Sequence, residues 1–219
     1  MTKKEKWNKI YHCPGYFYGA EPIHLLQEKW KRLRFGKVLD LAMGEGRNAV
    51  FLASNGFEVS GFDISDVAVD KAKKLAYEKG VTIETKVTDL DLYLFPMFGF
   101  DTIILSYFKP LFRYYSEIYR ALVQGGTLLV EGYTTDQLMK APLAEYDNHD
   151  YFYPNELLKQ LQGFQILFYN EETFDNRSMV QCIAKKPTDR DAVKYGFAKD
   201  EGGGTVKFKS AEDLFKKKS

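Results

Sequence analysis

Short apolar and β-branched runs alternate with segments of helical periodicity along the first part of the chain. The runs predict strands over residues 37–41, 57–62, 81–87, 100–105 and 127–130. Between them, the pattern predicts helices over residues 48–54, over the segment that Ser65 caps and Gly80 ends, and over residues 111–123. This rhythm is typical of βαβ units, which build a parallel sheet with helices on both faces.

The pattern changes after the fifth predicted strand. A short helix is predicted over residues 154–161, and two strands follow over residues 164–169 and 179–185. The link between these two strands is too short for the crossover that a parallel pair needs, so we expect an antiparallel pair. The predicted fold is therefore an α/β three-layer sandwich. Its sheet has seven strands and is mostly parallel, with an antiparallel last strand, in a Rossmann-like arrangement.

Composition and charge narrow the classes of partner. The chain has 31 Lys and Arg against 30 Asp and Glu, a net charge of +1, whereas nucleic-acid-binding proteins usually show a clear basic excess. The apolar runs fall short of the ~20 residues that span a bilayer, and the charged first residues do not make a signal peptide. Two cysteines, Cys13 and Cys182, make no disulfide framework. We expect a cytoplasmic monomer or homodimer that binds neither nucleic acid nor membrane.

A glycine-containing bend joins the first predicted strand to the first predicted helix. Gly44 and Gly46 allow a tight turn and a close approach of a ligand to the backbone, and the helix that follows offers unpaired N–H groups. Asp63, at the end of the second strand, has the spacing of a carboxylate that accepts hydrogen bonds from a ribose. This arrangement predicts a site for an adenosine-containing ligand.

Two kinds of ligand fit that bend. Gly44, Gly46 and Ala49 also satisfy the spacing of a dinucleotide site, so a nicotinamide-dependent oxidoreductase stays an alternative. Asp40, at the end of the first strand, favours the other kind because a carboxylate there repels a pyrophosphate. S-adenosylmethionine carries a cationic ammonium and a cationic sulfonium, and one opposite charge at ~4 Å contributes up to about 4 kcal/mol before desolvation.

The segment 38–53, which includes Val38-Leu39-Asp40-Leu41 and Gly44-Glu45-Gly46-Arg47-Asn48, resembles the class I S-adenosylmethionine-dependent methyltransferases. It is most similar to their tellurite-resistance-like and thiol-methyltransferase-like branch, and residues 16–22 are similar to the lid of that branch. The resemblance implies a methyltransferase domain over residues 1–187, with an aromatic lid over about 7–31. Residues 188–219 would be an appendage of unknown role. It further implies that S-adenosylmethionine contacts Tyr18, Asp40, Ala42, Gly44, Gly46, Asn48, Asp63, Ile64, Asp89, Leu90 and Ser106.

The chain departs from that branch at two places. Met43 stands where a small residue is common, which puts a flexible thioether near the donor or the core. The branch also tends to carry a His and an Arg between its last two strands, and here Arg177 matches while no His does. An oxyanion acceptor that depends on such a pair is therefore in doubt.

Methyl transfer is an in-line displacement that leaves a neutral thioether, so positioning supplies most of the catalysis. The sequence offers Ser106, His149 and Arg177 as candidate catalytic residues, with Arg113, Glu131 and Cys13 as weaker ones. We expect no metal site, because no histidine–cysteine cluster has ligand spacing.

The loop Ser106-Tyr107-Phe108-Lys109-Pro110 lacks the motif of enzymes that methylate exocyclic nitrogens of bases. The leading prediction is an enzyme that methylates a small, soft acceptor such as a thiol, a sulfide or a chalcogen species. The alternative is a regulatory or interaction module that binds the donor without turnover.

Overall fold

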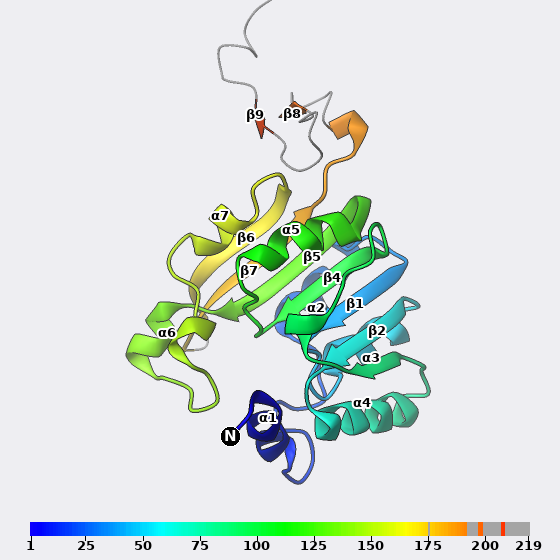
Figure 1. Cartoon of the computed structure of the whole chain (residues 1–219), viewed down its shortest axis with the longest axis vertical. Helices are drawn as coiled ribbons and strands as arrows, with labels where there is room; N and C mark the ends of the chain where they lie inside the picture. The colour runs from blue at the N-terminus through cyan, green and yellow to red at the C-terminus, as the bar shows by residue number, and fades with distance from the viewer. Residues whose placement is uncertain (175, 192–196, 199–206, 209–219) are drawn as a thin grey trace, which may run out of the picture.

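The computed structural model in Figure 1 describes residues 1–174, 176–191, 197–198 and 207–208. The predicted appendage 188–219 lies mostly outside the described residues. Within the described part, no helix is both long and apolar enough to cross a bilayer.

Helices and strands alternate as the sequence pattern predicts. The helices are α1 (Lys3–Tyr11), α2 (His24–Lys29), α3 (Arg47–Ser54), α4 (Asp66–Glu78), α5 (Arg113–Ala121), α6 (Thr135–Lys140) and α7 (Glu156–Gln160). Three short 3-10 turns are η1 (Trp30–Arg32), η2 (Leu90–Leu92) and η3 (Asn148–Asp150). The strands are β1 (Lys37–Leu41), β2 (Glu58–Asp63), β3 (Glu84–Val87), β4 (Phe100–Ser106), β5 (Leu122–Tyr133), β6 (Gln165–Phe174), β7 (Arg177–Lys185), β8 (Phe197–Ala198) and β9 (Lys207–Phe208).

The main sheet has seven strands in the order β3-β2-β1-β4-β5-β7-β6, and β8 and β9 form a separate antiparallel pair. Strands β1 to β5 are parallel, whereas β7 runs antiparallel to both β5 and β6. The predicted seven-stranded sheet with an antiparallel last strand is confirmed. The order reverses at β1 and β4, and in open α/β sheets such a switch point marks the crevice where ligands bind.

Two apolar layers sandwich the sheet. On one face, side chains of β1, β4, β5 and β7 pack against α5 and α7, with Ile103, Leu105 and Ile118 fully buried. On the other face, alternate residues of the same strands pack against α2, α3 and α4, with Leu26 and Ala72 fully buried. Figure 1 shows α5 and α7 in front of the sheet and α2 behind it. The central strands are therefore buried on both faces, as their nearly continuous apolar runs indicate.

Local capping follows the residues that the sequence analysis named. The Ser65 hydroxyl accepts a hydrogen bond from the N–H of Ala68 at 3.1 Å, which caps α4, and Gly80 follows that helix with φ of +67°. The fifth strand differs from the prediction. It begins at Leu122 because Gly125 adopts φ of +77° and bonds to the backbone of Lys186, so the chain continues in the sheet through a bulge instead of ending a helix there.

Candidate functional site

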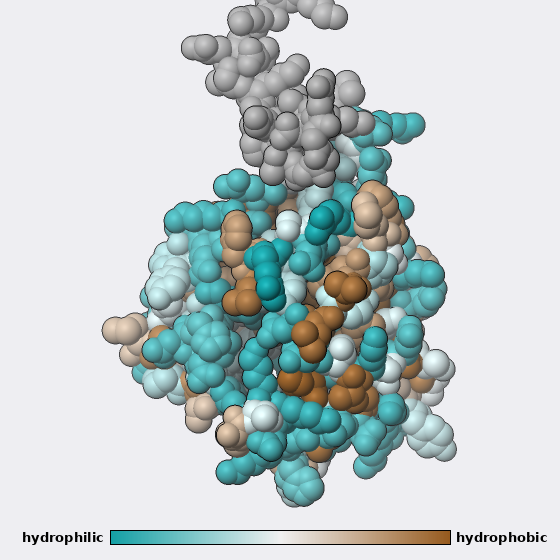
Figure 2. All heavy atoms as spheres, viewed as in Figure 1, coloured by the Kyte–Doolittle hydropathy of each residue, from teal (hydrophilic) through white to brown (hydrophobic). Residues whose placement is uncertain are grey.

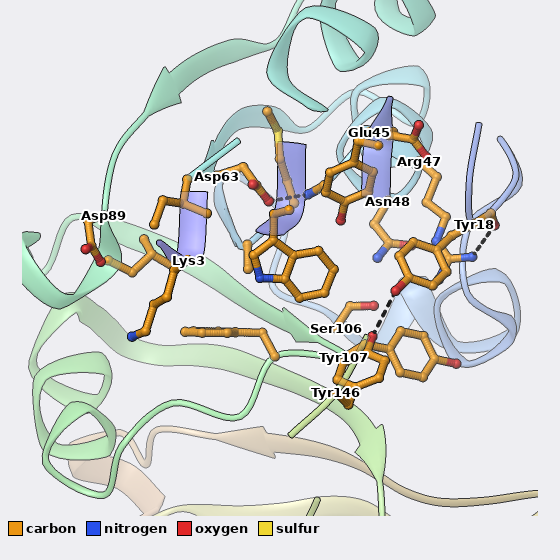
Figure 3. Close-up of a pocket in the computed structure, with 18 of the residues that line it drawn as sticks. Lys3, Tyr18, Glu45, Arg47, Asn48, Asp63, Asp89, Ser106, Tyr107 and Tyr146 are labelled. Carbon is orange, nitrogen blue, oxygen red and sulfur yellow. Dashed lines mark hydrogen bonds between the residues drawn. The ribbon is translucent and has the colours of Figure 1, made fainter. Parts of the chain in front are cut away.

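An open cavity with about 940 Å³ of empty space lies at the carboxyl ends of β1, β2 and β4 (Figure 3). Its volume falls in the range of ~300–1,000 Å³ that is usual for small-molecule sites. Its walls come from α1, the segment that follows it, the bend after β1, the ends of β2 and β4, and the loops after β3 and β5. The lining residues are Lys3, Trp7, Tyr11, Tyr18, Gly19, Ala42, Met43, Gly44, Glu45, Arg47, Asn48, Asp63, Ile64, Asp89, Leu90, Asp91, Ser106, Tyr107, Phe108 and Tyr146.

The bend between β1 and α3 depends on its two glycines. Gly44 has φ of +56°, and a Cβ there would lie 2.8 Å from the hydroxyl of Tyr11. Gly46 has φ of +82°, and a Cβ there would lie 2.7 Å from the Cβ of Ala72 on α4. Both residues therefore need the freedom of glycine. Only Gly44 lines the cavity, because Gly46 faces α4 and lets the bend pack against that helix.

Asp63 ends β2 and fixes the bend from the side. Its Oδ2 accepts a hydrogen bond from the N–H of Gly44 at 2.8 Å, and its Oδ1 accepts one from the N–H of Ser65 at 2.8 Å. Burial raises the pKa of Asp63 to about 6 although these N–H groups lower it. Each carboxylate oxygen keeps a second lone pair toward the cavity, where a ribose hydroxyl can donate. The carboxylate therefore both shapes the bend and offers acceptors to a ligand.

Asp40 lies behind the wall of the cavity. The residue is completely buried, and neither of its carboxylate oxygens has a hydrogen-bond partner among the described residues. Burial and the nearby Asp63 raise the pKa of Asp40 to about 7, while Arg47 lowers it. A buried carboxylate without a partner is costly, so a cationic group on the cavity side of the bend relieves that cost. The predicted direct contact of Asp40 is corrected to a charge that acts through the bend.

The adenosine end of the cavity is formed by the loops after β2 and β3. Ile64 and Leu90 give it apolar walls, and Asp89 opens η2 by accepting a hydrogen bond from the N–H of Asp91 at 3.0 Å. In Figure 3, Asp89 and Asp63 lie on one side of the cavity, and Tyr18 and Arg47 lie on the other. The four residues therefore separate a nucleoside end from an opposite end.

Helix α1 extends over the cavity as part of the predicted lid. Lys3 pairs with Asp91 at 2.8 Å, Lys4 with Asp66 at 2.8 Å, and Lys6 with Asp147 at 3.0 Å. These three pairs join α1 to three separate parts of the chain. The side chains of Trp7 and Tyr11 line the cavity and stack with their ring centroids 5.7 Å apart.

A buried ion pair ties the segment after α1 to the bend. Lys71 of α4 pairs with Glu45 at 2.8 Å and also donates to the carbonyls of Cys13 and Gly15. Glu45 accepts a further hydrogen bond from the N–H of Phe17 at 2.7 Å. The lid segment and the glycine bend are thus held by one charged cluster.

The end of the cavity opposite the nucleoside is rich in tyrosines. Tyr18 and Tyr146 approach each other with their hydroxyl oxygens 3.4 Å apart, and Tyr107 follows Ser106 at the end of β4. Burial raises the pKa values of Tyr18, Tyr107 and Tyr146 far above the usual value of a phenol, so these side chains stay protonated. Tyr107 has φ of +54°, a strained backbone for an aromatic residue, and its N–H donates to the carbonyl of Glu131 at 2.7 Å.

The structure brings most of the predicted donor residues together. Asp40 and Gly46 are the two that do not line the cavity, for the reasons given above. The lining includes Tyr18, Ala42, Gly44, Asn48, Asp63, Ile64, Asp89, Leu90 and Ser106. Met43 also lines it, and its sulfur packs against Gly61 of β2.

Two predicted catalytic residues lie outside the cavity. The side chain of His149 is 75% exposed, on a loop that a capping box between Asp147 and Asp150 closes. Arg177 is exposed at the start of β7, in the turn that joins it to β6. Neither residue lines the cavity, so both assignments are wrong for this structure. Carboxylates of Asp147 and Asp150 lie near His149, but the capping hydrogen bonds account for that arrangement.

Sequence reasoning missed several residues of the cavity. Trp7 and Tyr11 belong to the aromatic segment predicted as a lid, but nothing in the sequence showed which rings face inward. Tyr146 stands three residues before the predicted His149 and points into the cavity in its place. Arg47 was quoted within the motif without a role, and its position as the first residue of α3 is the signal that it borders the bend.

Comparison with known proteins agrees with this geometry. Residues 38–126 match a family described as a methyltransferase domain. A ubiquinone biosynthesis O-methyltransferase from Actinobacillus pleuropneumoniae serotype 7 (strain AP76) is 35% identical over 99 residues, which cover 42% of this chain and 42% of that protein. The match thus spans less than half the length of that relative.

Two crystal structures share the fold. One is a SAM-dependent methyltransferase from Methanosarcina mazei, at 21% identity and a TM-score of 0.60, with 77% of this chain and 100% of that chain covered. The other is TehB from Haemophilus influenzae, at 22% identity and a TM-score of 0.63, with 84% and 67% covered. At these identities the likeness shows the fold alone, so the tellurite-resistance-like branch stays a prediction.

The matched domain, the fold and the cavity together define the class. The chain is a class I S-adenosylmethionine-dependent methyltransferase, with S-adenosylmethionine as its cofactor. The residues present fit that cofactor. The glycine bend admits a close approach, Asp63 faces the cavity, and Asp40 supplies a buried negative charge without a partner.

Proposed function

We propose that this protein transfers a methyl group from S-adenosylmethionine to a small acceptor that is a soft nucleophile, such as a thiol. The bound cofactor supplies the methyl group on its cationic sulfur. Asp63 and Gly44 position the nucleoside and the bend, and α1 with Trp7 covers the cavity and keeps water from it. In-line transfer between positioned groups needs little further help from the protein.

The observation that carries the choice of acceptor is the set of side chains at the end of the cavity opposite the nucleoside. No histidine lines the cavity within the described residues. Tyr18, Tyr107 and Tyr146 keep their protons because burial raises their pKa values, and Arg47 is a cation. An alcohol or a protonated amine needs a base, which this end does not offer. A thiol of low pKa arrives already ionised near neutral pH and needs none.

A phenolic hydroxyl is a second candidate acceptor. The relative that shares 99 residues at 35% identity is named as an O-methyltransferase, and that name motivates the comparison. An acidic phenol is ionised in part near neutral pH, so it makes smaller demands on a base than an alcohol does. The two candidates differ in the atom that receives the methyl group.

A matched pair of acceptors tests the proposal. Thiophenol and phenol are each incubated with the protein and S-adenosylmethionine at neutral pH, and the release of S-adenosylhomocysteine is measured. We expect turnover with thiophenol at least about tenfold faster than with phenol. Faster turnover with phenol would favour the second candidate.

The same assay separates an enzyme from a module that only binds the donor. The variant Asp63→Ala serves as a control that loses donor binding. No release of S-adenosylhomocysteine with thiols, phenols or amines, from a protein that binds the donor by calorimetry, would contradict methyl transfer altogether.

A further inference from the structure

Arg47 is a cation on the cavity wall that has no acidic partner. Among the described residues, no carboxylate lies within 4.0 Å of its guanidinium, whereas the other cavity-lining cation, Lys3, pairs with Asp91. One N–H of Arg47 donates to the carbonyl of Tyr18 at 2.8 Å. A guanidinium has five N–H donors, so most of its capacity is left for a ligand.

The acids near Arg47 are engaged elsewhere. Glu45 pairs with Lys71 and accepts from the N–H of Phe17. Glu145 accepts a hydrogen bond from the hydroxyl of Tyr18 at 3.3 Å. The tyrosines around Arg47 stay protonated and add no negative charge. The positive charge at this end of the cavity is therefore not balanced by the described side chains.

The guanidinium lies among tyrosines from distant parts of the chain. Its Cζ is 5.7 Å from the ring centroid of Tyr18 and 5.7 Å from that of Tyr107. Tyr107 stacks on Tyr133 at the end of β5, and Tyr133 packs edge-on against Tyr146. Figure 3 shows the side chain of Arg47 running toward Tyr18, on the side away from Asp63 and Asp89. Arg47 thus borders the end of the cavity that the nucleoside leaves free.

From this arrangement we infer that Arg47 binds an anionic group of the methyl acceptor, most simply a carboxylate, and that the tyrosines contact the aromatic or apolar body of the same molecule. The inference rests on the proposed function and narrows its acceptor to a class. A planar guanidinium forms two parallel hydrogen bonds to a carboxylate, which fixes orientation as well as charge. Rigid aromatic walls then favour a flat acceptor body.

The donor offers a competing source of the same chemistry, because S-adenosylmethionine also ends in a carboxylate. The position of Arg47 against Tyr107 and Tyr18 favours the acceptor. The experiment therefore measures donor and acceptor binding separately.

The probes are 4-mercaptobenzoate and 4-mercaptobenzamide, which share a thiol and a ring and differ in one negative charge. Their binding to the protein saturated with S-adenosylhomocysteine is measured by calorimetry, so no turnover is needed. We expect the carboxylate to bind at least about tenfold more tightly than the amide in the wild type. In Arg47→Met the two probes bind equally, in Arg47→Lys the preference is intermediate, and the affinity for S-adenosylhomocysteine changes less than about threefold.

Arg120→Met is the matched control, since Arg120 is an exposed arginine of α5 that does not line the cavity. It keeps the full preference. A wild type that does not distinguish the probes, including one that binds neither, overturns the inference.

Two further outcomes also overturn it. One is a preference that survives Arg47→Met while the affinity for S-adenosylhomocysteine falls tenfold or more, which assigns Arg47 to the donor. The other is a preference lost in Arg177→Met and kept in Arg47→Met. Absence of methyl transfer with an intact charge preference would contradict the proposed function and leave the anion site standing.

Discussion

The two ends of the cavity are built in different ways. The nucleoside end is made by consecutive residues and by backbone hydrogen bonds, such as those that Asp63 accepts from Gly44 and Ser65. The opposite end is made by side chains from distant segments, including Tyr18, Tyr107 and Tyr146. The first design holds one ligand in a fixed geometry, whereas the second can change its ligand by single substitutions. Cofactor identity is therefore readable from a short motif, and acceptor identity is not.

Loss of the Asp63 carboxylate breaks the nucleoside end most severely. In Asp63→Ala the N–H groups of Gly44 and Ser65 lose their acceptor, and the predicted ribose contact is lost too. We expect the affinity for S-adenosylmethionine to fall about 100-fold, or roughly 2.7 kcal/mol. Calorimetry measures it, and Asp70→Ala, a change at an exposed carboxylate of α4, is the control. An unchanged affinity would remove the ribose contact from the site.

The charge of Asp40 gives the nucleoside end a pH dependence. Burial raises the pKa of Asp40 from 3.8 to about 7 and that of Asp63 from 3.8 to about 6. Ionised carboxylates attract the cationic donor, so its affinity should rise about tenfold from about pH 5.5 to about pH 7.5. In Asp40→Asn most of this rise is lost. A rise as steep as that of the wild type would show that other groups cause it.

The stability of the protein without donor should change with pH in the opposite direction. The folded state binds protons that the unfolded chain has released between about pH 4 and about pH 7, because both pKa values are raised on folding. The free energy of unfolding therefore decreases as pH rises through this window. Urea titrations at both ends of the window measure the slope, which we expect to be shallower in Asp40→Asn.

The ion pairs of the lid should have the smallest effect. Lys3, Lys4 and Lys6 pair with acids whose side chains are at least 38% exposed, and such pairs contribute ~0–1 kcal/mol each. Replacing all three lysines with alanine should weaken donor binding about threefold at low salt and have no effect at about 1 M salt. The triple variant of Lys37, Lys73 and Lys74, which form comparable exposed pairs on other elements, is the control. An effect that does not depend on salt would assign these lysines a role other than charge.

The sequence was sufficient for the sheet and for most of the nucleoside end. Apolar runs of period two and glycines at fixed positions act locally, so β1, the bend and Asp63 were predicted correctly. The opposite end depends on which member of a loop turns inward, and this is set by tertiary packing. Tyr146 and His149 lie on one loop with similar local sequence, yet only Tyr146 lines the cavity.

Two strand ends illustrate the same limit. Ala42 and Tyr107 both adopt positive φ directly after β1 and β4, and both line the cavity. Neither residue type signals that conformation, because the strain is imposed by the neighbouring strands and loops. The missed boundary at Leu122 has a similar origin, since Gly125 forms a bulge held by Lys186 and does not end a helix.

The position of α1 has a consequence for how the molecule assembles during synthesis. The helix emerges from the ribosome before every segment on which it rests, and its last ion-pair partner, Asp147, is made well after β4 and β5. The sheet can form behind an undocked α1, since domains generally fold while later residues are still being added. The cover of the cavity is then the final part to settle. A nascent chain that lacks the loop around Asp147 would hold a nearly finished core and an open pocket.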